Sequence, residues 1–240
     1  MNKTALSYWF PKIEAAGIPV PKTRIVKMPR EAMESILAGF DGKDAGDPKP
    51  FFETLKAAAA EIGFPAFLRT NHTSGKHEWE RCCYLKSADD IPRQVFALAE
   101  YSEIAGGIMG LPWDTWVVRE FLPTLPLGIC PRYANMPICR EFRYFVEDGH
   151  VRCWHPYWPE HALTRGGAIL NGGDLYALSH IDVKQEATLI SLAEKTGCAV
   201  GGAWSIDILE TKRGWFVTDM AEANVSWHDW PECPNNFRKA

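Results

Sequence analysis

The chain has 240 residues, 46% of them hydrophobic and 23% charged, and 26 basic against 30 acidic side chains give a net charge of −4. This composition is typical of a globular protein and excludes a disordered chain. The slight acidity disfavours binding to duplex nucleic acid. No apolar run reaches the roughly 18 residues of a membrane span, and the first residues lack the apolar core of a signal peptide. At about 150 residues per domain, one large domain or two small lobes are expected.

Seven cysteines are spread along the chain without a C-x-x-C pair. The odd count, in a chain long enough to need no covalent staple, predicts reduced cysteines and a cytoplasmic protein. A zinc site from Cys130, Cys139, Cys153 and a nearby histidine is disfavoured, because zinc ligand pairs normally lie about two to four residues apart.

The first half of the chain mixes helical and extended patterns. Turn residues over 41–50 predict a loop. Apolar side chains at helical spacing predict a helix over 51–62 that ends at Gly63. The further elements expected here are a strand over 66–68, a polar loop over 69–76, a strand over 81–86, a helix over 91–104 and a strand over 116–123 that ends in a proline.

The second half predicts two hairpins and a helix. Alternating polar and apolar residues over 141–146 continue, after a turn, over 151–154. Asp182 has the position of an N-cap for a helix that Gly197 closes. Helices and strands therefore mix in two clusters, before and after about residue 122, which predicts an α+β fold with two lobes.

The last hairpin, over 203–210 and 215–220, has the most informative turn. Residues 212–214, Lys-Arg-Gly, fit a three-residue loop that needs glycine at its end. The register that follows pairs Thr211 with Trp215, Leu209 with Val217 and Asp207 with Asp219. Opposed carboxylates repel unless a cation lies between them, and Mg²⁺ shared with substrate phosphates is the natural candidate. A turn shifted by one residue would instead expose one aspartate. Glu222 and Asn224 either complete an oxygen shell or are ordinary loop residues.

Several segments resemble, in their order along the chain, the motifs of the ATP-grasp superfamily. The segment 17–23, GIPVPKT, resembles the family's opening segment, and 63–69, GFPAFLR, resembles its strand "GFPVVVK", whose final lysine contacts nucleotide phosphate. Arg69 stands at that lysine position. Such a replacement occurs in a clade of small ATP-grasp proteins common in bacteriophages, which this chain resembles more than the long biosynthetic ligases.

The resemblance continues downstream. Residues 73–76, TSGK, are similar to the loop that closes over the phosphates, and 118–122 to the hinge strand whose backbone reads the adenine edge. Residues 141–146 look like the strand whose arginine reaches the phosphates. Residues 205–208 and 216–219 resemble the paired strands that carry the magnesium carboxylates. The family's usual Glu-x-Asn ending is altered here, because Asp219 takes the glutamate position and Glu222-Ala223-Asn224 follows three residues later.

The resemblance implies a set of site residues. The implied nucleotide-binding residues are Arg69, Ser74, Gly75, Lys76, Arg119, Glu120, Phe121, Leu122, Glu141 and Arg143, of which Arg69, Lys76 and Arg143 are the implied catalytic residues. The implied metal ligands are Asp207 and Asp219, with Asn224 and Glu222 as further candidates.

The implied fold is a single ATP-grasp unit over 1–240, with two α+β lobes gripping the nucleotide between them. The N-terminal lobe is expected over 17–118 with the phosphate loop, a hinge over 119–123, and the C-terminal lobe over 124–240 with the metal-binding hairpin. No separate N-terminal Rossmann-like domain is expected.

The implied function is an ATP- and Mg²⁺-dependent ligase that joins a carboxylate to an amine, or less often a thiol, through an acylphosphate with release of ADP. Its expected partners are small-molecule or peptide substrates, and the chain is expected to be a monomer or homodimer. Two alternatives stay open: a small-molecule kinase that uses the same nucleotide site, and a non-catalytic protein whose aromatic side chains bind a carbohydrate or single-stranded nucleic acid.

Ten tryptophans are the one unusual count, and they form either a binding platform or core. The candidates for acceptor contact are Trp154, His155, Trp158, Arg165 and His228. Packing explains the aromatic cluster around Trp154 equally simply, since tryptophan is large and usually mostly buried.

Overall fold

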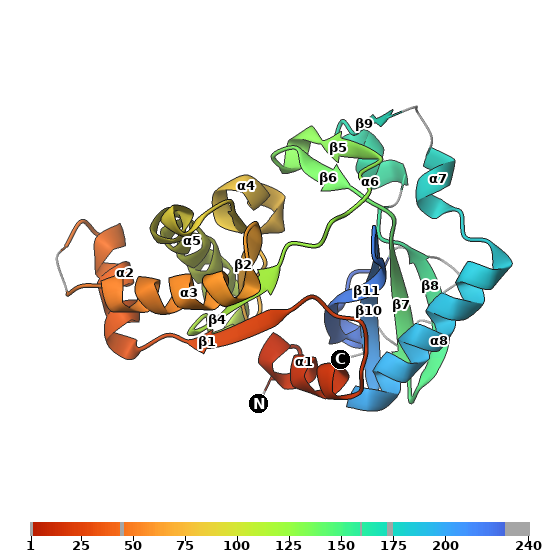
Figure 1. The fold of residues 1–240 in the computed structure, drawn as a ribbon, viewed down its shortest axis with the longest axis horizontal. Helices are drawn as coiled ribbons and strands as arrows, with labels where there is room; N and C mark the ends of the chain where they lie inside the picture. Colours follow the sequence, from red (N-terminus) through yellow and green to blue (C-terminus); the bar gives the residue numbers. More distant parts are fainter. Residues whose placement is uncertain (1, 44–45, 159, 172–174, 229–240) are drawn as a thin grey trace. The chain divides into compact units, whose positions relative to one another are not determined.

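A computed structural model describes residues 2–43, 46–158, 160–171 and 175–228 (Figure 1). The chain divides into two compact units, Pro21–Phe121 on the one hand, and Met1–Val20 with Leu122–Ala240 on the other. Helices accompany antiparallel sheets in both units, so the predicted α+β class is confirmed. Within these described ranges, no helix is both long and apolar enough to cross a membrane.

The unit Pro21–Phe121 contains one four-stranded sheet in the order β1-β4-β2-β3. Its strands are β1 (Thr23–Lys27), β2 (Ala66–Thr70), β3 (Tyr84–Leu85) and β4 (Thr115–Glu120), and its helices are α2 (Arg30–Phe40), α3 (Lys49–Ile62), α4 (Trp79–Cys82) and α5 (Ile91–Met109). Two 3-10 turns, η1 (Lys76–Glu78) and η2 (Ala88–Asp90), complete it. Helix α3 packs on β1 and β4, and α5 packs on β2.

Strand alternation divides the side chains of this sheet between two faces. Leu68, Trp116 and Val118 are buried in the core that includes residues of α3 and α5. The neighbouring positions belong to the other face, on which Phe67 pairs with Arg119 and Arg69 pairs with Val117. Two arginines therefore lie on the face of the sheet opposite its covering helices.

The predicted strand over 81–86 is wrong in its first half. Arg81 and Cys82 end the short helix α4, and β3 has only two residues, Tyr84 and Leu85. The side-chain amide of Gln94 in α5 donates to the backbone carbonyls of Glu80 (3.2 Å) and Tyr84. These carbonyls are thus satisfied by a side chain rather than by a strand ladder, which the local sequence pattern does not reveal.

The other unit contains two sheets, in the orders β11-β10-β7-β8 and β6-β5-β9. Its strands are β5 (Gly128–Cys130), β6 (Met136–Ile138), β7 (Glu141–Glu147), β8 (His150–Pro156), β9 (Ile169–Leu170), β10 (Ala203–Thr211) and β11 (Gly214–Glu222). Its helices are α1 (Leu6–Ala15), α6 (Glu160–Arg165), α7 (Leu175–Ser179) and α8 (Val183–Val200), with the 3-10 turns η3 (Pro131–Tyr133) and η5 (Ala223–Val225). Helix α8 crosses one face of the larger sheet (Figure 1) and packs on β7, β8 and β10.

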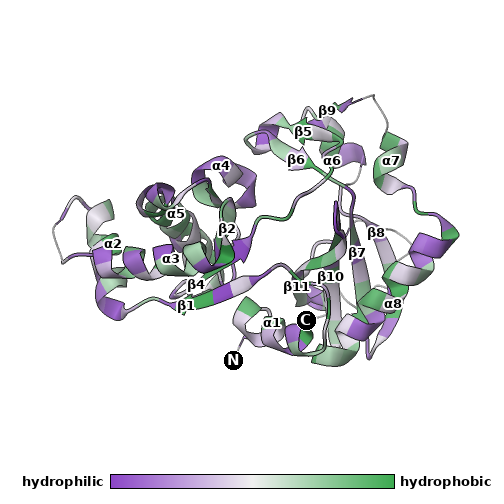
Figure 2. Cartoon of the chain, viewed as in Figure 1, coloured by the Kyte–Doolittle hydropathy of each residue, from purple (hydrophilic) through white to green (hydrophobic). Residues whose placement is uncertain are grey.

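Helix α8 begins where the sequence predicts and ends later. The Asp182 carboxylate accepts a hydrogen bond from the Gln185 backbone nitrogen at 2.8 Å, as expected for an N-cap. The prediction that Gly197 closes the helix is wrong, because the helix continues to Val200. A Cβ atom at Gly197 would lie 2.5 Å from Cγ1 of Val146 in β7, so this glycine permits close helix–sheet packing. Hydrophilic and hydrophobic stretches alternate along α8 (Figure 2), as expected for a helix that covers a sheet.

The turn of the last hairpin differs from the prediction by one residue. Lys212 and Arg213 form it, so Thr211 pairs with Gly214, and Leu209 pairs with Phe216 rather than Val217. The Thr211 hydroxyl donates to the Gly214 carbonyl at 2.7 Å and accepts from the Arg213 backbone nitrogen at 3.0 Å, which closes the tighter turn.

A β-bulge then restores the predicted pairing of the two aspartates. The register shifts between Asp207 and Ile208, where Thr218 is the extra residue, and beyond it Asp207 pairs with Asp219. The Thr218 hydroxyl lies 3.3 Å from the Asp207 carbonyl and 3.2 Å from the Glu141 carboxylate. The expected aspartate pair is therefore confirmed, although the turn from which it was derived is wrong.

The expectation of a wholly reduced chain is wrong at one position. Cys82, Cys83, Cys130, Cys139 and Cys198 are free cysteines, but Cys153 is disulfide-bonded. Count and spacing along the sequence do not report which thiols the fold brings together.

Candidate functional site

A row of charged and polar residues crosses the larger sheet. Antiparallel pairing aligns His155 of β8, Arg143 of β7, Asp207 of β10 and Asp219 of β11 in this order. The adjacent row, which begins with Trp154 and Tyr144, belongs to the opposite face, where Trp154 Nε1 donates to Glu186 of α8 at 3.2 Å. The charged row therefore lies on the face away from α8.

Arg143 and Asp207 form a two-pronged ion pair at the centre of this row. Arg143 Nε donates to Asp207 Oδ1 at 2.7 Å, and Nη2 donates to Oδ2 at 2.8 Å. The two side chains are only 14% and 4% exposed. Burial alone would lower the pKa of Arg143, but the charge and hydrogen bonds of Asp207 outweigh it and raise the pKa above its ordinary value. The guanidinium therefore stays charged, and its fork is directed at the carboxylate.

The third nitrogen of Arg143 is also engaged. Nη1 donates to the Trp227 backbone carbonyl at 3.1 Å, and the guanidinium carbon lies 5.0 Å from the centroid of the Tyr157 ring. Neither Tyr157 nor Trp227 was singled out from the sequence as a partner of Arg143, because both are distant from it along the chain. In this structure the arginine expected to reach phosphate is held by its own unit.

The expected metal ligands are only partly brought together. Asp219 lies directly opposite Asp207 and accepts a hydrogen bond from the Met220 backbone nitrogen at 3.1 Å. Glu222 pairs with Trp204 at the end of β11, and Asn224 is exposed in η5.

The donor set fits Mg²⁺ bound together with a phosphate ligand. Within the part of the chain that the structure describes, no three His, Cys, Asp or Glu side chains gather as a metal site would require. The Asp207–Asp219 pair instead offers two carboxylates, and Mg²⁺ is commonly held by one or two carboxylates together with substrate phosphates and water. Two hard oxygen donors without a sulfur or nitrogen ligand do not suit zinc.

The unit Pro21–Phe121 contributes a second group of charges. Arg69 and Arg119 are 6% and 4% exposed and occupy diagonal positions on β2 and β4. Arg69 Nε donates to the Thr70 carbonyl at 3.1 Å, and Arg119 Nε donates to the Thr23 hydroxyl at 3.2 Å. Two buried guanidinium groups on one sheet face form a positive surface suited to an anion.

The loop after β2 is fixed by its own small side chains. The hydroxyls of Thr70 and Thr73 lie 2.8 Å apart, and the Thr73 hydroxyl lies 3.1 Å from that of Ser102 in α5. Gly75 has a φ of +61°, and a Cβ there would lie 2.9 Å from the Cβ of Cys82. This position requires glycine, both for its conformation and for its packing.

Ser74 and Lys76 are partly exposed on either side of Gly75, and Lys76 opens η1. His72, in the same loop, has a pKa below its ordinary value, first because it is partly buried and second because Arg69 is close. The expected phosphate loop is therefore an ordered segment close to the charge of Arg69.

The expected hinge residues lie at the end of β4 and just after it. The Glu120 backbone nitrogen donates to the Lys22 carbonyl at 2.8 Å, which ties β4 to β1. The Phe121 ring centroid lies 6.0 Å from that of Trp79 and 4.8 Å from that of Tyr84. Leu122 is buried and begins the second segment of the other unit. The aromatic partners Trp79 and Tyr84 had no distinguishing signal in the sequence.

The candidate acceptor residues separate into different places. Trp154 lies on the face covered by α8, whereas His155 belongs to the charged row and is 3% exposed. The ring centroids of His228 and His155 lie 5.4 Å apart. Trp158 is buried beside Tyr157 and Tyr133, and Arg165 is exposed at the end of α6. Of these candidates, His155 and His228 come together near Arg143.

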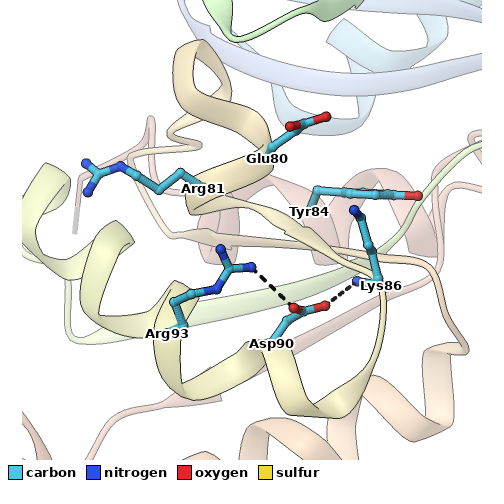
Figure 3. Close-up of a pocket in the computed structure, with 6 residues that line it drawn as sticks. All are labelled: Glu80, Arg81, Tyr84, Lys86, Asp90 and Arg93. Carbon is cyan, nitrogen blue, oxygen red and sulfur yellow. Dashed lines mark hydrogen bonds and ion pairs between the residues drawn. The ribbon is translucent and has the colours of Figure 1, made fainter.

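A surface pocket of about 300 Å³ lies elsewhere in the unit Pro21–Phe121 (Figure 3). Its lining residues are Glu80, Arg81, Tyr84, Lys86, Asp90 and Arg93. Arg93 donates to Asp90 at 3.2 Å, and the Lys86 backbone nitrogen donates to the same carboxylate at 2.8 Å. These bonds anchor the start of α5, and none of the expected site residues lines this pocket.

Comparison with known proteins defines the class of this fold. A family model described as an ATP-grasp domain, the third family of its clade, matches residues 58–234. The match covers most of the chain, and the chain therefore belongs to this ATP-grasp family. The resemblance drawn from the sequence and the ATP-grasp fold are thereby confirmed. No curated protein matches the chain.

Solved structures with this fold differ widely in sequence. C-terminally truncated Cdc123 from Schizosaccharomyces pombe is 12% identical over 92% of this chain and 86% of its own, with a TM-score of 0.59. The ADP complex of PurK, an N5-carboxyaminoimidazole ribonucleotide synthetase, is 16% identical over 91% and 44%, with a TM-score of 0.50. A RimK domain ATP-grasp protein from Sphaerobacter thermophilus is 17% identical over 91% and 58%, with a TM-score of 0.45. This chain thus spans little more than half of the RimK domain protein. At these identities the likeness establishes the fold alone.

Proposed function

We propose that this protein is an ATP- and Mg²⁺-dependent ligase that joins a carboxylate to an amine and releases ADP. The observation that supports it most is the row containing Arg143, Asp207 and Asp219, where a phosphate-type cation and two adjacent carboxylates share one sheet face. Membership in the ATP-grasp family and the positive face around Arg69 and Arg119 support the same reaction class.

Each group has a defined task in this proposal. Arg69 and Lys76 bind the phosphates, the first as a planar fork and the second as a mobile point charge. The backbone of residues 119–122 binds the adenine edge. Asp207 and Asp219 would hold Mg²⁺, which when bound neutralises negative charge on the transferred phosphoryl group.

The chemistry requires no nucleophile from the protein. An oxygen of the substrate carboxylate attacks the γ-phosphorus of ATP, ADP leaves, and an acylphosphate forms. The amine then attacks the acyl carbon and phosphate leaves with the bond electrons, giving an amide. The protein positions these groups and stabilises charge, which supplies most of the catalysis in phosphoryl transfer.

The proposed substrates are small-molecule or peptide carboxylates and amines, acted on by a monomer or homodimer in the cytoplasm. The side chains proposed to contact the acceptor are His155 and His228, which lie beside the charged row.

An ADP-release screen against pooled carboxylates and amines tests this function. We expect ADP and phosphate only when both substrate classes are present, a hydroxamate when hydroxylamine replaces the amine, and no turnover in the Asp207→Asn variant. Products of AMP and pyrophosphate would contradict the proposal. ADP release with a phosphate ester and no hydroxamate would instead identify a kinase.

A further inference from the structure

Asp207 has two claims on it. It is the central carboxylate of the proposed metal site, and both of its oxygens accept hydrogen bonds from Arg143, at 2.7 and 2.8 Å. Arg143 in turn is the residue expected to bind phosphate, and all three of its guanidinium nitrogens are engaged, the third by the Trp227 carbonyl. The two residues therefore occupy each other's proposed binding groups.

This pairing is incompatible with simultaneous metal binding of full strength. A carboxylate has lone pairs to spare beyond those that Arg143 uses, but a divalent cation beside the guanidinium places two positive groups against each other. With side chains only 14% and 4% exposed, little water screens that repulsion. Metal binding at Asp207 is thus favoured when the guanidinium has another anion to bind.

We propose that Arg143 and Mg²⁺ compete for Asp207, and that nucleotide phosphates resolve the competition by binding the Arg143 fork. The inference rests on the proposed function and adds an order to it: the nucleotide-free protein has low affinity for metal, and phosphate and metal bind with positive coupling. Arg143 acts as a built-in counter-ion that keeps Asp207 neutralised until nucleotide arrives.

The direct test measures metal binding without nucleotide. Mn²⁺, a paramagnetic substitute for Mg²⁺, is titrated into the full-length protein and followed by electron paramagnetic resonance. We expect Arg143→Gln to bind Mn²⁺ about tenfold more tightly than wild type, which corresponds to about 1.4 kcal/mol, and the double variant Arg143→Gln/Asp207→Asn to lose this gain.

Arg140→Gln is the matched control. Arg140 directly precedes Arg143's strand and pairs with Glu210 at 2.9 Å, with side chains 16% and 22% exposed. This variant removes the same charge from a neighbouring ion pair, so it should leave Mn²⁺ affinity near the wild-type value. Equal Mn²⁺ affinity in wild type and Arg143→Gln, or an equal gain in Arg140→Gln, would overturn the proposal.

A second measurement uses wild-type protein and so does not depend on the variant folding. The ¹H–¹⁵N spectrum of arginine Nε–H groups should contain a slowly exchanging Arg143 signal, assigned by its absence in Arg143→Lys. We expect this signal to stay unchanged with Mg²⁺ alone and to shift when Mg²⁺ and ADP are added together. A shift with Mg²⁺ alone would overturn the proposal.

Failure of the proposed function would be recognised separately. If the protein binds no nucleotide, Mg²⁺ with ATP produces no thermal shift, whereas the nucleotide-free Mn²⁺ titration still decides whether Arg143 and metal compete for Asp207.

Discussion

The arginines of the two sheets differ in what they contact inside their own unit. Arg143 meets a carboxylate, Asp207, through two charge-assisted hydrogen bonds. Arg69 and Arg119 direct Nε to the carbonyl of Thr70 and the hydroxyl of Thr23, which carry dipoles but no charge. A carboxylate neutralises its arginine, whereas a dipole does not cancel a full charge. One face is therefore expected to contribute mainly to stability and the other mainly to anion binding.

The largest expected effect comes from breaking the ion pair. Asp207→Ala leaves the guanidinium of Arg143 buried without its counter-charge, and the free energy of unfolding should fall by about 3–5 kcal/mol. Urea denaturation of the purified variant measures this loss. The matched variant Glu210→Ala breaks the more exposed Arg140–Glu210 pair and should cost less. Equal stability of Asp207→Ala and wild type would show that the ion pair is not an anchor of this sheet.

The next effect separates binding from stability on the other sheet. Arg69→Gln removes a buried cation from the proposed phosphate-binding face, and a charge-assisted hydrogen bond contributes about 1.5–3 kcal/mol. The Kd for Mg²⁺–ATP should therefore rise about 10- to 100-fold in calorimetry. Arg24→Gln on the adjacent strand, where the arginine is 54% exposed and paired with Glu61, is the control and should bind like wild type. Unchanged affinity in Arg69→Gln would remove this face from the nucleotide site.

The sequence predicts the aspartate pair better than it predicts the strand that carries it. The turn was assigned one residue too long, and the bulge at Thr218 compensates for that shift so that Asp207 still meets Asp219. A bulge held by a contact to Glu141, distant in sequence, leaves no local pattern. The motif order along the chain, by contrast, is enough to define the ATP-grasp fold, because that fold is encoded in segments distributed over most of its length.

The partners of the site residues are less predictable than their identity. Trp154 and His155 are neighbours in sequence, yet strand alternation directs them to opposite faces, and only the position of α8 decides which face is covered. The pairing of Arg143 with Asp207 likewise follows from the register of β7 and β10. Sequence reasoning names the chemistry of such residues, while register and packing decide which of them meet.

The smallest expected effect reports the field of Arg69 directly. Burial and the nearby charge of Arg69 both lower the pKa of His72, so it should titrate below its ordinary value of about 6.5. Because the folded state binds this proton more weakly than the unfolded state, the contribution of His72 to stability is complete above the unfolded pKa. It declines as pH falls from there toward the folded pKa.

In Arg69→Gln the pKa of His72 should rise but stay below its ordinary value, because burial is the larger cause of the shift. An imidazole titration by nuclear magnetic resonance, with the His72 signal assigned by its loss in His72→Gln, measures this change. Arg24→Gln should leave the titration unchanged. If the pKa of His72 is the same in Arg69→Gln and wild type, the positive field of Arg69 is neutralised by its surroundings, and the contrast between the two sheets disappears.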